Sequence, residues 1–144
     1  KGWGRGDALY ACDARTGNCT DFHAYFIALC RAAIIPARFA IGFTIPANKN
    51  AGVIGGYHCW AEFHANGKWV PVDISEADKH PELADYYFGN HPANRLELSR
   101  GRDITVKPAP KAGPFNYFFG PHLEVNGKEV PVKATFEFKR LPEK

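Results

Sequence analysis

The pattern of apolar and polar residues first indicates a helix near the N-terminus. Over residues 18–33, apolar side chains recur at the i, i+4, i+7, i+8 and i+11 positions of one helical face, namely Phe22, Phe26, Leu29, Cys30 and Ala33. Cys19 extends this stripe at its N-terminal end. Pro36 ends the predicted helix, because proline has no N–H to donate. The run 37–45 then predicts a strand, and a Gly- and Asn-rich loop follows over 46–56.

A second pattern predicts a β-hairpin over residues 57–75. The Asn-Gly pair at 66–67 lies between two strand-like runs and is the preferred pair for a type I′ turn. The register that follows makes His58 and Asp73 diagonal neighbours on one face of the hairpin. Such neighbours lie roughly 7 to 8 Å apart at the backbone, so their side chains can hydrogen-bond. Cys59 must then point to the opposite face.

The remaining sequence carries weaker signals. Residues 81–87 predict a helical turn within an otherwise irregular stretch. A second Asn-Gly pair at 126–127 and the alternating pattern of 133–139 predict further antiparallel strands. Together these elements predict an α+β fold. A length of 144 residues with 45% hydrophobic residues fits one domain over 1–144.

Composition and charge exclude several classes of function. The net charge of +3 is spread along the chain without a basic run, so we expect no nucleic-acid partner. No run of 18 apolar residues is present, so we expect no membrane partner. The N-terminus carries no targeting segment, which leaves the compartment open, with a secreted or periplasmic location favoured over a cytoplasmic one.

Cysteine spacing argues against a structural metal site. The four cysteines show no C-x-x-C spacing, and they are too few for a disulfide scaffold. A metal site built from His58, Cys59 and Cys12 fails on spacing and on the opposed faces of its first two members. We therefore expect no metal and no cofactor. Cys30 and Cys59 are interpreted as core thiols, whereas the role of Cys12 stays open.

The candidate chemistry centres on Cys19. A thiol is a good nucleophile only as a thiolate, which a helix N-terminus and a nearby imidazolium both favour. If His58 takes the proton and Asp73 holds the imidazole, the three residues form a catalytic triad, and the Cys19 N–H is a ready donor to an oxyanion. The alternative is that Cys19 is a buried thiol, because one Cys, one His and one Asp can be chosen from many chains.

Other polar and aromatic residues have two interpretations each. Trp60 shares the predicted face of His58, where it either contacts substrate and shields the imidazole from water or simply packs in the sheet. Arg38 either pairs with Glu62 or is solvated. His23, one helical turn after Cys19, either lines the cleft or lies on the surface.

Three segments, in order along the chain, resemble the transglutaminase-like superfamily of papain-fold thiol enzymes. "GNCTDFHAYFIALCRAAIIPARFAIGF" is similar to its nucleophile helix and following strand, "YHCWAEF" to its histidine strand, and "KWVPVDIS" to its aspartate strand. The resemblance covers roughly residues 3–78. It implies a nucleophile helix packed on an antiparallel sheet, with Cys19, His58 and Asp73 as the catalytic residues.

The C-terminal third further resembles bacterial and archaeal members described as cysteine proteases. The resemblance implies thiol-dependent acyl transfer at amide bonds, most simply proteolysis or amide hydrolysis, with a peptide or protein as substrate and no cofactor. Two alternatives stay open: a cross-linking transglutaminase, and a catalytically silent peptide-binding module of the same fold.

The sequence departs from the family pattern in two places. Ile34 stands where the motif has glycine before Ile-Pro-Ala-Arg, at a helix end where glycine takes the left-handed conformation. We expect this departure to cost stability rather than chemistry. Members also carry a helical segment ahead of the nucleophile, and only 18 residues precede Cys19. The resemblance therefore implies that part of the N-terminal helical region is missing.

Overall fold

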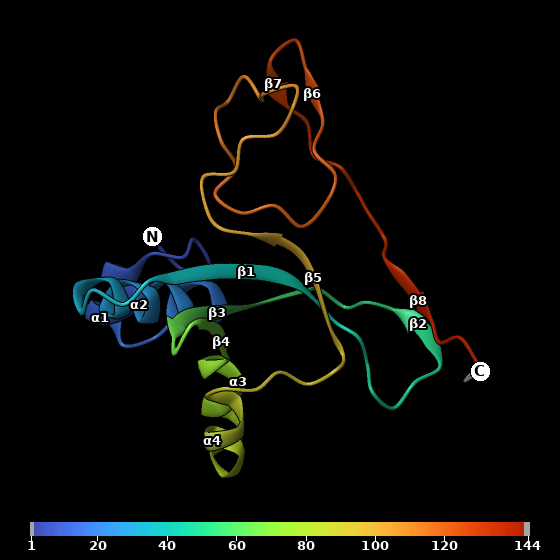
Figure 1. Ribbon diagram of the computed structural model, residues 1–144. Helices are drawn as coiled ribbons and strands as arrows, with labels where there is room; N and C mark the ends of the chain where they lie inside the picture. The colour runs from blue at the N-terminus through green and yellow to red at the C-terminus, as the bar shows by residue number, and fades with distance from the viewer. Residues whose placement is uncertain (1, 143–144) are drawn as a thin grey trace.

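The fold is centred on a four-stranded antiparallel sheet. The computed structural model describes residues 2–142. Its main sheet has the strand order β4-β3-β1-β5, formed by β1 (Ala37–Thr44), β3 (Tyr57–Ala65), β4 (Lys68–Val72) and β5 (Arg95–Arg100). The helix α2 (Cys19–Ala32) packs against β1 and β3, and α1 (Ala8–Ala14) packs against α2 (Figure 1). The α+β class and the packing of the Cys19 helix on an antiparallel sheet are confirmed.

Helix α2 matches the predicted helix, but its buried face differs from the predicted stripe. Leu29 is 51% exposed, whereas the buried positions are Thr20, Asp21, His23, Ala24, Ile27 and Cys30. The helix therefore presents polar side chains to the interior in its first turn and apolar ones further along. A hydrophobic pattern misplaces such a face, because it assigns polar residues to solvent. The apolar part packs on Phe39, Ile41 and Cys59 of the sheet.

The predicted hairpin has the predicted register only in part. β3 pairs with β4 from Ala65 opposite Lys68 to Ala61 opposite Val72, as the Asn-Gly turn requires. The strand ends there, and α3 (Ile74–Lys79) begins directly after Asp73. The expectation that residues 73–75 continue the strand is therefore wrong. The Asp73 side chain accepts the N–H of Glu76 and caps this helix, a role that aspartate strongly favours.

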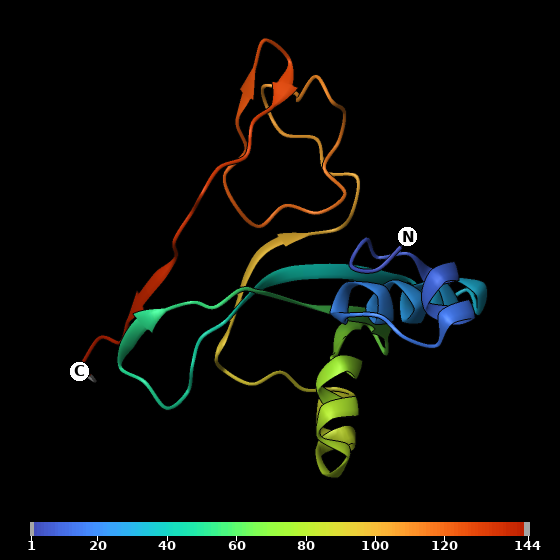
Figure 2. The same cartoon turned by 180° about the vertical axis from the view of Figure 1, so that it is seen from behind.

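The remaining elements are short. The 3₁₀ turn η1 (Pro81–Leu83) and α4 (Ala84–Tyr87) confirm the predicted helical turn, and β6 (Glu124–Val125) pairs with β7 (Lys128–Glu129) in the predicted second hairpin. Only β8 (Glu137–Lys139) of the alternating stretch is a strand; it pairs with β2 (Ala51–Val53), inside the predicted loop. Figure 2, seen from behind, shows the β6–β7 hairpin and α4 at opposite ends of the molecule.

The C-terminal end of α2 is strained at Ile34. This residue has φ of 60° and its side chain is 92% exposed. A left-handed conformation costs an L-residue roughly 1–2 kcal/mol, and a β-branched side chain is especially unsuited to it. The position is the one where the family motif has glycine. We therefore expect Ile34 to lower the stability of the fold. It lies at the opposite end of α2 from Cys19, so we expect no effect on the chemistry of the thiol.

Candidate active site

The first turn of α2 is fixed by a capping box. The Asn18 side chain accepts the backbone N–H of Thr20 at 3.0 Å, and Asp21 reaches back to the Asn18 N–H at 3.1 Å. Cys19 is the first residue of the helix, so its N–H has no partner within the helix and lies at the positive end of the helix dipole. The capping box therefore fixes the position of Cys19, which carries both a thiol and a backbone N–H without a partner in the helix.

Asp21 also holds the N-terminal segment against this helix end. Its side chain is fully buried and accepts the backbone N–H groups of Gly4 at 2.7 Å and Gly6 at 2.9 Å. Buried carboxylates need such donors, because an unpaired buried charge is costly. Asp21 was not singled out from the sequence, although an Asn followed three residues later by Asp before an apolar run is a variant of the capping-box signal.

His58 and Asp73 are in direct contact. His58 Nε2 lies 2.6 Å from Asp73 Oδ2, and Asp73 is fully buried. Asp73 Oδ1 also accepts from Ser75 Oγ at 3.0 Å. His58 lies opposite Gly42 of β1, where a Cβ would collide with the carbonyl oxygen of Leu96, so only glycine allows β5 to pass this close. Asp73 thus binds the ring from a capped helix start, and the strand opposite His58 is tightly paired with β5.

Burial and charge shift the pKa values of these three residues. Interactions of the Cys19 sulfur with the Cys59 thiol and with His58 lower the pKa of Cys19 to about 4, although burial opposes the shift. Burial disfavours the charged form of His58, but the Asp73 and Cys19 contacts outweigh it and raise the pKa of His58 to about 9. Burial also opposes ionisation of Asp73, yet the contact with His58 holds the pKa of Asp73 well below its usual range. Between about pH 4 and pH 9 the favoured state is a thiolate beside an imidazolium.

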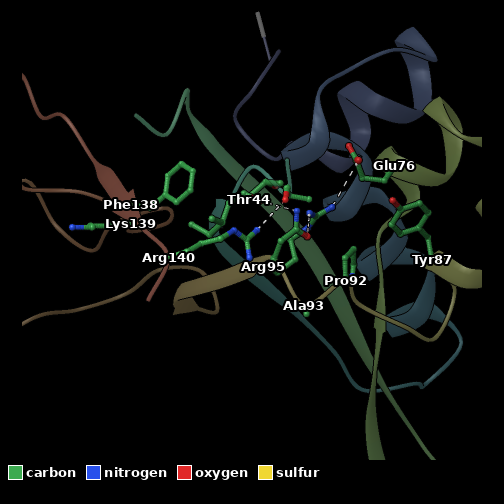
Figure 3. A pocket seen from close by; sticks show the side chains of 12 residues that line it. Thr44, Glu76, Tyr87, Pro92, Ala93, Arg95, Phe138, Lys139 and Arg140 are labelled. Carbon is green, nitrogen blue, oxygen red and sulfur yellow. Dashed lines mark hydrogen bonds and ion pairs between the residues drawn. The ribbon is translucent and has the colours of Figure 1, made fainter. Parts of the chain in front are cut away.

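Arg95 contacts the same carboxylate oxygen of Asp73 as His58 does. Its side chain is 6% exposed, and Nη2 lies 3.4 Å from Asp73 Oδ2 and 3.8 Å from Glu76 Oε2. A cavity of about 680 Å³ is lined by Arg95 and Glu76 among other residues. Figure 3 shows Glu76 and Tyr87 toward one end of it, Phe138 and Arg140 toward the other, and Arg95 between them. Neither Cys19 nor His58 lines this cavity. Its link to Cys19, His58 and Asp73 runs through Arg95, which lines the cavity and contacts Asp73.

Trp60 lies near His58 but has little free surface. It is 4% exposed, its ring centroid lies 6.5 Å from that of His58, and His91 packs edge-to-face on it at 4.8 Å. This burial favours the shielding of His58 over contact with substrate. Arg38 pairs with Glu62, one of its two predicted states, and stacks on Trp69.

The other histidine and cysteine positions are now defined. His23 is fully buried, so both expectations for it, the cleft wall and the surface, are wrong. Cys59 is buried in the core as predicted, but it also faces the Cys19 sulfur. Cys12 is exposed, and all four cysteines are free. Within residues 2–142, no group of three or more His, Cys, Asp or Glu side chains is arranged to hold a metal ion, and no helix is long and apolar enough to cross a bilayer.

Comparison with known proteins identifies the family. The family model of the transglutaminase-like superfamily matches residues 1–74, which include Cys19, His58 and Asp73. The chain belongs to the transglutaminase-like superfamily. The superfamily consists largely of thiol-dependent enzymes. The thiol of Cys19, the imidazole of His58 and the carboxylate of Asp73 are therefore the groups on which a functional proposal for this chain rests.

A similar protein is known from Haemophilus influenzae. This uncharacterized protein is 35% identical over 154 residues, an alignment that covers 85% of this transglutaminase-like chain and 42% of the relative. The chain thus spans less than half the length of that relative. No solved structure matches the chain.

Proposed function

We propose that this chain hydrolyses amide bonds by covalent thiol catalysis, with Cys19 as nucleophile, His58 as proton carrier and Asp73 as the group that orients His58. One observation carries the proposal: His58 binds Asp73 through Nε2 at 2.6 Å, while the pKa of the nearby Cys19 thiol is lowered to about 4. A nucleophile activated by a base that a third group orients is the signature of covalent acyl transfer.

The first half of the reaction breaks the amide. The Cys19 thiolate attacks the carbonyl carbon, and the Cys19 backbone N–H donates to the oxyanion that forms. The tetrahedral intermediate collapses when His58 gives its proton to the leaving amine. The products of this half are a free amine and a thioester on Cys19. Asp73 stays ionised throughout and stabilises the imidazolium.

The second half releases the acyl group. Neutral His58 takes a proton from water, and the resulting nucleophile attacks the thioester carbon. The carboxylic acid leaves, the Cys19 thiolate is restored and His58 is protonated again. A primary amine in place of water would give cross-linking by the same steps. Water is the simpler acceptor, because transfer to an amine needs a second site that admits the amine and keeps water out.

The test of this function compares the two acceptors on peptide substrates. We expect the protein, incubated with mixed peptides, to release carboxylic acid products whether or not a primary amine is added. Mass spectrometry of the products distinguishes acids from amides, and a Cys19→Ala variant provides the blank. If products form only when amine is added, the proposed activity is wrong and the protein is a cross-linking enzyme. No product from a protein with a reactive Cys19 would favour a peptide-binding module.

A further inference from the structure

The buried His23 connects two backbone segments of the site, the one that carries Cys19 and the one that carries Asp73. It lies on α2, one turn after Cys19, and is fully buried. Its Nδ1 is 2.6 Å from the carbonyl oxygen of Cys19, and its Nε2 is 3.1 Å from the backbone nitrogen of Ile74. Ile74 follows Asp73 and is the first residue of α3. One side chain thus bonds the residue that carries the thiol and the residue next to the carboxylate.

The two partners fix the protonation state of His23. A carbonyl oxygen only accepts, so Nδ1 carries the proton and donates to Cys19. The Ile74 N–H only donates, so Nε2 carries the lone pair and accepts. The ring is therefore a neutral imidazole. Burial also favours the neutral form, because it lowers the pKa of His23. Cys59 Sγ lies 3.8 Å from Nδ1 and Asp73 Oδ1 lies 3.7 Å from Nε2, and both distances are longer than the two hydrogen bonds that engage these nitrogens.

The bond to Ile74 satisfies a donor at the start of α3, and the bond to Cys19 ties the same ring to the start of α2. Ile74 N–H is among the first donors of α3, which have no partner inside the helix. Cys19 lies at the start of α2, where the Asn18 side chain accepts the backbone N–H groups of Thr20 and Asp21. A rigid ring between the two starts sets their separation. His58 must lie across this separation to contact Cys19 on one side and Asp73 on the other.

We propose that His23 is a positioning residue, which sets the distance between the Cys19 and Asp73 helix starts so that His58 contacts both. The inference rests on the proposed function of the trio. His23 does not touch the reacting atoms, and it acts through the backbones of Cys19 and Ile74. A displacement of about 1 Å in such a site can cost about 100-fold in rate, so removal of the ring has a large expected effect on chemistry.

Three variants separate the two bonds. In His23→Asn the amide nitrogen can occupy the place of Nδ1 and donate to Cys19, but nothing reaches Ile74. In His23→Gln the amide oxygen can occupy the place of Nε2 and accept from Ile74, but the bond to Cys19 is lost. His23→Leu removes both. The matched control is Ile27→Ala, which opens a cavity on the same buried face of α2 without touching either helix start.

The measurement is the rate of Cys19 alkylation by iodoacetamide as a function of pH, with peptide mapping. In His23→Leu we expect the midpoint of Cys19 ionisation to move up from about 4 and the rate near pH 5 to fall about tenfold or more. His23→Asn and His23→Gln are expected to lie between it and the parent. Ile27→Ala is expected to melt at a lower temperature with an unchanged pH profile.

The outcomes separate this inference from the proposed function. A parent protein whose Cys19 titrates like a free thiol overturns the proposed function and the inference with it. A parent with a low Cys19 pKa whose three His23 variants all keep the same pH profile overturns the inference alone. If His23→Leu does not fold, the Asn and Gln variants decide by the same criterion, since each keeps one of the two hydrogen bonds.

Discussion

Replacing His58 with alanine is expected to lower the alkylation rate of Cys19 near pH 6 by roughly 100-fold. The parent thiol, with its pKa lowered to about 4, is almost fully ionised at that pH. A free cysteine with a pKa of about 8.5 is ionised to well under 1% there. The Cys59 contact stays in the variant, but a thiol is a weak donor, so the positive charge of His58 is the main loss.

The pH dependence distinguishes this effect from unfolding. Near pH 10 both proteins carry a thiolate, so the difference in alkylation rate should nearly vanish. Hydrolysis by the parent should rise through about pH 4, as Cys19 ionises, and fall through about pH 9, as the His58 proton needed by the leaving amine is lost. His64→Ala, an exposed histidine on the same strand, is the control and should behave like the parent. A His58→Ala variant as reactive as the parent near pH 6 would contradict the ion pair.

Replacing Asp73 with asparagine is expected to lower kcat by about 100- to 10,000-fold while Cys19 and His58 stay in place. The amide oxygen can still accept the Glu76 N–H, so the cap of α3 is retained. The negative charge that stabilises the His58 imidazolium is lost, however. We therefore expect the upper limb of the pH profile to move below about 9, because the pKa of His58 falls.

The control for Asp73 is the neighbouring Glu76. Glu76→Gln removes the second carboxylate near Arg95, at 3.8 Å, without touching His58, and should change kcat by only a few-fold. Asp73→Asn leaves Arg95 with Glu76 as its remaining carboxylate partner, so a lower Tm is expected as well. Rates are therefore compared below the melting transition seen by circular dichroism. An Asp73→Asn variant with the parental pH profile would show that Asp73 does not act on His58.

Much of the site could be predicted because its signals are local. The Asn-Gly turn fixes the β3–β4 register, and this register brings His58 near Asp73. The contact between His58 and Asp73 does not come from a continuous strand, because the strand ends at Val72 and Asp73 caps α3. The choice between strand and cap depends on competition for one side chain, which periodicity does not report.

The parts that were missed depend on contacts between distant segments. His23 is polar and belongs by pattern to the solvent face, yet its partners on Cys19 and Ile74 make burial favourable. Asp21 is buried because the N-terminal segment folds over it and donates backbone N–H groups. Arg95 meets Asp73 only because β5 pairs with β1. None of these pairings leaves a trace in the spacing of residues along the chain.

The central claim is that Cys19 is the nucleophile, and a peptide bearing an electrophilic carbonyl group tests it most directly. The protein is incubated with the peptide near neutral pH, the mass of the intact protein is measured, and the adduct is mapped by proteolysis. We expect a single adduct on Cys19, none in a Cys19→Ala variant, and slower formation in His58→Ala. An adduct on the exposed Cys12 with Cys19 unmodified, or equal modification of all four cysteines, would contradict the account.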